Sequence, residues 1–157
     1  QKFAYGKVLD FGGGIGTHAL SASFLSDVEH VWFVDLNPQN RSFVEQRAKQ
    51  LGIEDQISVH RDLESTSNVI FDSVICLDVL EHIPDPSKQL EIFLEKLSPE
   101  GIALMNWYFY KGNDGEYPFH FDDPEMIEKF FTTLQFNFIE VFHPFLITTR
   151  AYKPLIK

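Results

Sequence analysis

A glycine cluster directly after an apolar run is the part of this sequence best suited to binding a reactive ligand. Residues 7–16 read Lys-Val-Leu-Asp-Phe-Gly-Gly-Gly-Ile-Gly, so Asp10 ends the apolar run and Gly12, Gly14 and Gly16 follow it. Glycine tolerates positive φ and has no Cβ, which permits a sharp turn with the backbone close against a ligand. Such turns otherwise bind a pyrophosphate, but a carboxylate at Asp10 opposes phosphate and attracts an ammonium group. The pattern therefore favours a cofactor with an amino-acid end over a dinucleotide.

A second acid, Asp35, ends the next apolar run, about 20 residues after the glycines. At that spacing an acid can accept hydrogen bonds from both hydroxyls of a ribose. The alternative is a surface acid or a cap beside Asn37. We expect the ribose role.

An aromatic stretch in the second half of the chain predicts a pocket for an acceptor. It comprises Trp-Tyr-Phe-Tyr at 107–110 and Glu-Tyr-Pro-Phe-His-Phe-Asp at 116–122, and we place Trp107, Tyr110 and Tyr117 in the pocket. Aromatic rings can stack on a ring or hold a desolvated amine. Alternatively, Trp107 belongs to the inward face of a strand. His120 and Asp122 have a possible metal spacing, but an Asp-Asp-Pro helix cap explains the acid more simply and no third ligand is evident, so we expect no metal.

Strands must alternate with helices to position these residues, which predicts an α/β, Rossmann-like, doubly wound sheet. Asparagine or aspartate followed by proline marks three helix starts, at residues 37–38, 85–86 and 123–124. Residues 136–142 and 146–152 are separated by a link too short for a crossover, so they should pair as an antiparallel hairpin. We expect strands at 8–11, 31–35, 57–60, 71–77 and 102–110, helices at 17–26, 38–51, 86–97 and 124–132, and a turn at 98–101. The sheet then has seven strands, five of them parallel before the hairpin.

Composition restricts the class of protein. With 157 residues, 44% of them hydrophobic and 16 of them Phe, the chain suits a single domain over residues 1–157. A formal net charge of −10 opposes nucleic-acid binding. The single cysteine, Cys76, excludes an intrachain disulfide and fits a reducing compartment. No apolar run has transmembrane length and no signal peptide is evident, so we expect a cytoplasmic protein without a membrane partner.

In five motifs the chain resembles the class I S-adenosylmethionine-dependent methyltransferases. Each motif alone is moderately specific, but their order and spacing together are specific, and the resemblance covers essentially the whole chain. It implies the class I methyltransferase fold and S-adenosyl-L-methionine as cofactor. Family members usually carry N-terminal helices that close over the cofactor, and we expect this chain to lack them. The motifs are Val-Leu-Asp-Phe-Gly-Gly-Gly-Ile-Gly at 8–16, Val-Asp at 34–35, His-Arg-Asp-Leu at 60–63, Phe-Asp with Leu-Asp-Val-Leu-Glu-His-Ile-Pro at 71–84, and Leu-Ser-Pro-Glu-Gly at 97–101.

The resemblance assigns roles around the cofactor. Asp10 holds the ammonium of the methionine portion, and the glycines let the backbone pass beside it. Asp62 accepts from the adenine amino group, although an acid capping a turn is the alternative for this residue. The remaining expected contacts are apolar walls from Leu36 and Leu63 and the backbone around Cys76 and Leu77, where the Cys76 side chain is a packed apolar group.

Methyl transfer from a sulfonium is a direct displacement, so it always requires alignment of the nucleophile, the methyl group and the sulfur. It requires a base only when the nucleophile arrives protonated. His82 is the first candidate base because it follows the fourth strand at the carboxyl edge of the sheet; Glu81 then orients it. The alternative is a structural histidine that bonds to backbone within residues 81–85. His120 is a second candidate. We expect the acceptor to be an oxygen or nitrogen atom of a small molecule.

Two other functions fit parts of the sequence. Gly14, Gly16 and Ala19 match the G-x-G-x-x-A pattern of NAD(P)-dependent oxidoreductases, and Asp35 suits NAD equally well. Asp10 and the closing hairpin count against that assignment. A cofactor-binding partner subunit without turnover is the other alternative, and the intact glycines and acids argue against a degenerate pocket.

Overall fold

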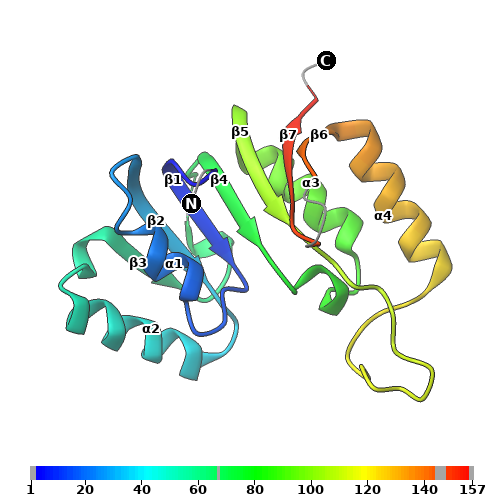
Figure 1. The fold of residues 1–157 in the computed structure, drawn as a ribbon, viewed down its shortest axis with the longest axis horizontal. Helices are drawn as coiled ribbons and strands as arrows, with labels where there is room; N and C mark the ends of the chain where they lie inside the picture. The colour runs from blue at the N-terminus through cyan, green and yellow to red at the C-terminus, as the bar shows by residue number, and fades with distance from the viewer. Residues whose placement is uncertain (1–2, 67, 144–147, 156–157) are drawn as a thin grey trace.

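The computed structural model describes residues 3–66, 68–143 and 148–155. Within these residues seven strands form one sheet in the order β3-β2-β1-β4-β5-β7-β6 (Figure 1). β1 pairs in parallel with β2 and β4, β2 with β3, and β4 with β5. β7 pairs antiparallel with both β5 and β6, which confirms the predicted closing hairpin. The bounds are β1 Gly6–Phe11, β2 Val28–Val34, β3 Ile57–His60, β4 Phe71–Cys76, β5 Leu97–Met105, β6 Phe138–Phe142 and β7 Arg150–Pro154.

The three asparagine- or aspartate-proline pairs begin helices as predicted. The side chains of Asn37, Asp85 and Asp123 each accept a hydrogen bond from a backbone N–H in the first turn, at 2.9, 3.0 and 2.8 Å. Each cap is followed by proline, which lacks the N–H that the first helical position leaves unpaired. The helices are α1 Thr17–Ala22, α2 Pro38–Leu51, α3 Pro86–Lys96 and α4 Pro124–Asn137.

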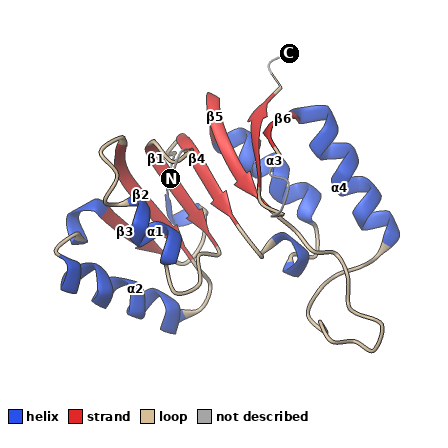
Figure 2. Ribbon diagram, viewed as in Figure 1, coloured by secondary structure: helices blue, strands red, loops and turns tan. Residues whose placement is uncertain are grey.

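Helices cover both faces of the sheet, as a doubly wound fold requires (Figure 2). Successive residues of a strand point to opposite faces. Val8 accordingly packs in a cluster with Ala19 of α1 and Val44 of α2. Leu9 packs on the other face, in a cluster that contains Phe93 of α3 and Phe130 of α4. The two clusters together form the core and fix the carboxyl ends of the parallel strands at one edge.

The fifth strand departs from the sequence prediction. It begins at Leu97 and ends at Met105, so the predicted turn at 98–101 belongs to the strand and residues 106–110 do not. The pairing with β4 shifts register between Phe71 and Ser73, and this irregularity accommodates the Pro-Glu-Gly stretch without a break in the strand. Asn106 follows the end of the strand, and its side chain accepts from the Asp78 N–H at 2.6 Å and donates to Asp78 Oδ1 at 2.7 Å.

The ends of other helices and strands differ from the predicted ones by a few residues. α1 ends at Ala22 rather than at residue 26, and α4 continues to Asn137, so that β6 starts later than predicted. The last strand runs from Arg150 to Pro154. The prediction of a strand from residue 146 falls partly on residues 146–147, which lie outside the described residues.

No helix in the described part of the chain is long and apolar enough to cross a membrane. The longest, α2 and α4, have 14 residues each, and both carry polar side chains. A membrane-spanning helix needs about 20 predominantly apolar residues.

The loop between β5 and α4, residues 106–123, projects beyond the ends of the parallel strands (yellow-green in Figure 1). In open parallel sheets the crevice at the carboxyl ends of the strands is where ligands bind. The loop meets the turn that follows β4, where the Phe121 N–H donates to the Glu81 carbonyl oxygen at 2.8 Å.

Candidate active site

A cavity of about 750 Å³ lies at the carboxyl edge of the sheet. Five residues that the sequence predicts as cofactor contacts line it: Gly12, Asp35, Leu36, Asp62 and Leu63. They come from the ends of β1, β2 and β3. This volume is within the range of ordinary small-molecule sites, about 300–1,000 Å³.

The glycine turn forms a second, smaller cavity of about 260 Å³ that adjoins the first, since Phe11, Gly12 and Asp78 line both. Gly12 has φ 69°, and a Cβ on it would lie 2.5 Å from the Val79 side chain. Only glycine fits there. Gly13, which the sequence pattern did not single out, is equally constrained, because its Cβ would lie 2.6 Å from Asp10 Oδ2.

Asp35 lies at the end of β2 with 9% of its surface exposed, and its carboxylate organises the turn around it. Asp35 Oδ2 accepts from the Gly14 N–H at 2.9 Å and from Asn40 Nδ2 at 3.2 Å, and Asp35 Oδ1 accepts from the Asn37 N–H at 2.8 Å. A carboxylate has about four acceptor positions, so these bonds leave capacity for a ligand hydroxyl. Both the ribose role and the alternative role beside Asn37 are compatible with this geometry.

Asp10 is 2% exposed and lines the smaller cavity. Its Oδ2 accepts the Ala19 N–H of α1 at 2.9 Å, so the carboxylate caps a helix whose N-cap residue, Gly16, has no side chain to do so. Burial raises the pKa of the Asp10 carboxyl to about 7; the Ala19 hydrogen bond opposes this rise and the nearby Asp35 adds to it. A cation in the smaller cavity would favour the ionised form.

Asp62 lines the larger cavity and also caps a turn, which was the alternative for this residue. Its Oδ1 accepts the Ser65 N–H at 3.0 Å, at the start of the short helical turn Glu64–Thr66. Leu36 is 77% exposed at the cavity, whereas Leu63 packs partly against the core. An exposed leucine beside a cavity offers an apolar wall for a ligand ring.

Asp78 and Gln89 are among the polar residues at the larger cavity that were not predicted as contacts. Asp78 follows β4 and is the only non-glycine residue with positive φ in the described ranges, at 56°. Its Oδ1 accepts from Asn106 Nδ2 at 2.7 Å. Gln89 of α3 contributes a buried amide nitrogen, Nε2, that has no hydrogen-bond partner among the described residues. The place of Asp78 directly after a strand signalled its position at this edge, but no sequence feature distinguished Gln89.

Cys76 and Leu77 were both predicted to lie beside the cofactor, but only Leu77 lines a cavity. The Cys76 side chain is fully buried in the core, where burial raises the pKa of its thiol well above the usual value. It lines neither cavity, in keeping with the packed apolar role expected for the side chain. Leu77 lines the smaller cavity beside the glycine turn.

His82 is exposed at the larger cavity, one residue after the buried Glu81. Its Nδ1 lies 3.1 Å from the carbonyl oxygen of Phe119. A carbonyl only accepts hydrogen bonds, so Nδ1 carries the proton and Nε2 retains its lone pair. The backbone bond expected from the structural alternative is thus present, but its partner lies on the 106–123 loop rather than within residues 81–85.

The 106–123 loop brings an aromatic cluster beside His82. The His120 ring lies with its centroid 4.7 Å from that of His82 and stacks on Tyr117 at 5.0 Å. Tyr108, which was not predicted, contacts the rings of Tyr110, Tyr117 and His120 at 5.5–5.9 Å. Tyr110 and Tyr117 therefore lie together, 39% and 44% exposed, although neither lines the two cavities described above.

Trp107 lies in a different environment from the two tyrosines with which it was grouped. Its ring packs against Phe130 and Phe131 of α4 at 4.9 and 5.9 Å and near Tyr152 of β7 at 6.1 Å. Its side chain thus packs inward under α4, as the structural alternative expected, although the residue lies beyond the end of β5. The alternation of the strand continues past its end, since Ala103, Met105, Trp107 and Phe109 all pack in one cluster.

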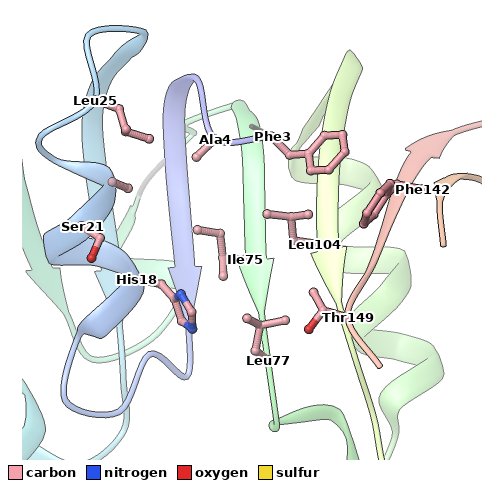
Figure 3. Close-up of a pocket in the computed structure, with 11 residues that line it drawn as sticks. Phe3, Ala4, His18, Ser21, Leu25, Ile75, Leu77, Leu104, Phe142 and Thr149 are labelled. Carbon is pink, nitrogen blue, oxygen red and sulfur yellow. The ribbon is translucent and has the colours of Figure 1, made fainter. Parts of the chain in front are cut away.

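A third cavity, of about 300 Å³, lies on the sheet face between α1 and the C-terminal strands (Figure 3). Its walls are mainly apolar and include Phe3, Ile75, Leu104 and Phe142. His18 and Leu77 line both this cavity and the smaller cavity at the glycine turn, so the two adjoin. It contains none of the other predicted contact residues.

Comparison with known proteins agrees with the sequence motifs. A family model described as a methyltransferase domain matches residues 2–139. A ubiquinone biosynthesis O-methyltransferase of Psychrobacter cryohalolentis is 31% identical over 104 residues, which cover 64% of this chain and 40% of that protein. The chain thus spans only part of the length of this curated relative.

Two solved structures share the architecture. PKMT2 from Rickettsia typhi, in complex with AdoHcy, matches with a TM-score of 0.57 and 26% identity over 64% of this chain and 20% of that chain. A putative rRNA-methylase from Clostridium thermocellum matches with a TM-score of 0.72 over 99% of this chain and 91% of that chain. The second likeness, at 16% identity, shows a common fold.

Proposed function

Because this chain belongs to the methyltransferase domain family, whose methyl donor is S-adenosyl-L-methionine, we propose that it transfers a methyl group to an oxygen or nitrogen atom of a small molecule. The class I fold expected from the sequence is confirmed by the order and direction of the seven strands in the described residues. We also propose a cytoplasmic location, which the single buried cysteine favours.

One observation carries the proposal: the predicted contacts from three separate strands line one cavity. Asp35 and Leu36 lie after β2 and Asp62 and Leu63 lie after β3, so the adenosine portion fits the larger cavity. The methionine portion then extends into the smaller cavity at the glycine turn, where Asp10 offers a carboxylate for its ammonium. Because the two cavities share lining residues, one extended ligand can occupy both.

The chemistry asks little of the protein beyond positioning. The sulfonium loses its charge as the methyl group leaves, so no new charge forms on the leaving group. Alignment of nucleophile, methyl carbon and sulfur therefore accounts for most of the acceleration. When the nucleophile arrives protonated, His82 Nε2 is the candidate proton acceptor, since the Phe119 carbonyl keeps the other ring nitrogen protonated.

Two features favour a small-molecule acceptor. The net charge of −10 is unsuited to a phosphate backbone. The exposed Tyr110 and Tyr117, which lie next to His120, offer ring faces for an aromatic or cationic group. The curated relative in Psychrobacter cryohalolentis is named as an O-methyltransferase, which supports an oxygen acceptor.

Calorimetric titration with S-adenosylhomocysteine tests cofactor binding, with NADH as the matched control ligand. We expect saturable binding of the first and none of the second. The opposite result would contradict the proposal and support the oxidoreductase alternative. Mass spectrometry of reactions with phenolic, carboxylic and amine acceptors then tests turnover, with an rRNA fragment as the comparison. Cofactor binding without any methylated product would instead support a silent partner subunit.

A further inference from the structure

Glu81, His82 and His120 form a cluster that the proposed function does not explain. Glu81 and His82 lie on the short helical turn Leu80–His82 after β4, and His120 lies on the 106–123 loop. The loop is held against the turn because the Phe121 N–H donates to the Glu81 carbonyl oxygen at 2.8 Å. One potential ligand atom from each of the three side chains lies within 4.8 Å of the other two.

The Glu81 carboxylate is in an unusual position for an acid. The residue is only 2% exposed, and its buried Oε2 atom has no hydrogen-bond partner among the described residues. A buried polar atom without a partner destabilises the folded state, and a charged one does so strongly. A bound cation would provide the missing partner.

Both histidines have the same ring nitrogen bound to a backbone carbonyl of the 106–123 loop. His82 Nδ1 lies 3.1 Å from the Phe119 carbonyl oxygen, and His120 Nδ1 lies 3.1 Å from the Tyr110 carbonyl oxygen. Each Nδ1 therefore carries the proton, and each Nε2 has a free lone pair. A histidine that binds a metal almost always donates its other N–H to a carbonyl or carboxylate, which fixes the ring.

We propose that Glu81, His82 and His120 bind one divalent transition-metal ion, with zinc as the best match. Two imidazoles and one carboxylate suit zinc or iron, whereas calcium and magnesium prefer oxygen ligands alone. Ligand atoms about 2.1 Å from a tetrahedral ion lie about 3.4 Å apart, so the exposed His82 and the loop residue His120 need only small adjustments to reach one ion. Three protein ligands leave a fourth position open for water or a substrate atom.

The sequence did not predict this site because its ligands come from two segments that are distant in the chain. The spacing of His120 and Asp122 suggested a local pair, but Asp122 instead forms an ion pair with Lys111 at 3.4 Å. The additional ligands come from the turn after β4, distant in sequence. The prediction that no metal is bound rested on the absence of an evident third ligand, and the structure places Glu81 and His82 beside His120.

A metal ion and the base role compete for the same atom. His82 Nε2 has one lone pair, which binds either a proton or a metal ion. The proposed site can therefore be tested in the absence of cofactor and acceptor. S-adenosylhomocysteine binding can be measured separately with a chelator present, so failure of one proposal does not imply failure of the other.

The experiment is a titration of the untagged, chelator-treated chain with Zn²⁺ by calorimetry and with Co²⁺ by visible absorption. We expect one saturable site and intense d–d bands from tetrahedral Co²⁺. His120→Ala and His82→Ala should each weaken Zn²⁺ binding at least about tenfold and abolish the bands, because each removes a direct ligand. His143→Ala is the matched control, since His143 is exposed and pairs with Glu140 outside the cluster.

Glu81→Gln provides a second test that needs no comparison of affinities. The neutral amide keeps the side-chain volume, so the variant should fold, but Zn²⁺ should no longer raise its melting temperature as it raises that of the wild type. Absence of a saturable site in the wild type overturns the proposal. So does Zn²⁺ binding by His120→Ala that is as tight as that of the wild type. Should Glu81→Gln not fold, the two histidine variants decide the result.

Discussion

The two sides of the cleft are built differently. On the proposed cofactor side, Asp10 lies near the end of β1, Asp35 directly follows β2, and Asp62 follows β3 by two residues. Each acid therefore belongs to the stretch of chain that forms its strand. On the proposed acceptor side, His82 meets His120 only because the 106–123 loop folds back on the turn after β4. The first arrangement is fixed by local sequence and strand order, and the second by a few long-range contacts. Variants on one side should therefore affect binding of the cofactor and variants on the other should affect turnover.

The largest effect is expected for Asp10→Asn. Burial raises the pKa of the Asp10 carboxyl to about 7 in the folded state, whereas in the unfolded chain it ionises near its usual value, about 3.9. The stability associated with this proton is present below pH 4 and is lost as the pH rises to 7. The loss amounts to roughly 4 kcal/mol. Asparagine avoids this loss and can still accept the Ala19 N–H, so at pH 8 the variant should have the higher free energy of unfolding.

Urea unfolding at pH 5 and pH 8 measures the Asp10 effect, with the exposed Asp27→Asn as control. The advantage of the variant should narrow towards pH 5, while its affinity for S-adenosylhomocysteine falls at both pH values. The wild-type affinity should also decline below pH 7, because Asp10 must lose its proton to bind the ammonium. A variant less stable than the wild type at pH 8 would show that the buried charge is not costly.

Asp35→Ala should have the next largest effect, a loss of about 100-fold or more in S-adenosylhomocysteine affinity. It removes the carboxylate proposed to accept from the ribose, and a hydrogen bond to a charged group is worth about 1.5–3 kcal/mol. It also removes the acceptor that holds the Gly14 N–H in the glycine turn. Asp35→Asn should lose less, since its oxygen can still accept from the Gly14 N–H that Asp35 binds. Calorimetry measures both, and an unchanged affinity for Asp35→Ala would place the ribose elsewhere.

On the acceptor side, His82→Ala should lower kcat about 100-fold with a protonated acceptor, a typical contribution of a general base. The affinity for S-adenosylhomocysteine should change little, because the other cofactor contacts remain. Steady-state kinetics with His143→Ala as the control measures this split. Equal losses in kcat for an acceptor that arrives deprotonated would argue against a base role.

The smallest effects are expected at Trp107, where a substitution should lower stability, and at Tyr117, where it should raise KM. Trp107→Leu should destabilise the fold by about 2 kcal/mol, since it removes ring contacts with Phe130 and Phe131. Tyr117→Leu should leave the melting temperature nearly unchanged and raise KM severalfold, because ring contacts contribute about 0.5–1.5 kcal/mol. Thermal unfolding and kinetics of both variants provide the measurement, and a reversed pattern would restore Trp107 to the pocket.

Features that depend on local sequence could be predicted, and features that depend on long-range contacts could not. The caps at Asn37, Asp85 and Asp123 were evident from adjacent residues, because the side chain and the N–H that it binds lie in one helical turn. The end of β5 was not, since the residue after it, Asn106, bonds through its side chain to Asp78, in the segment that follows β4. The second role of Asp10 could not be predicted from the sequence either. Asp10 was expected as a ligand contact, but its bond to the Ala19 N–H forms only when α1 packs beside β1.

The sequence by itself determined the succession of strands and helices along the chain, the glycine turn, and the acids near the ends of β1 and β2. These features depend on residue type and on spacing within one or two elements. Only the tertiary structure decided that the Oε2 atom of Glu81 is buried with no hydrogen-bond partner among the described residues, that His120 lies against His82, and that Gln89 contributes a buried amide to the cavity. Burial and contacts between distant segments depend on how the whole chain packs, because every neighbouring element changes which polar atoms remain accessible to water.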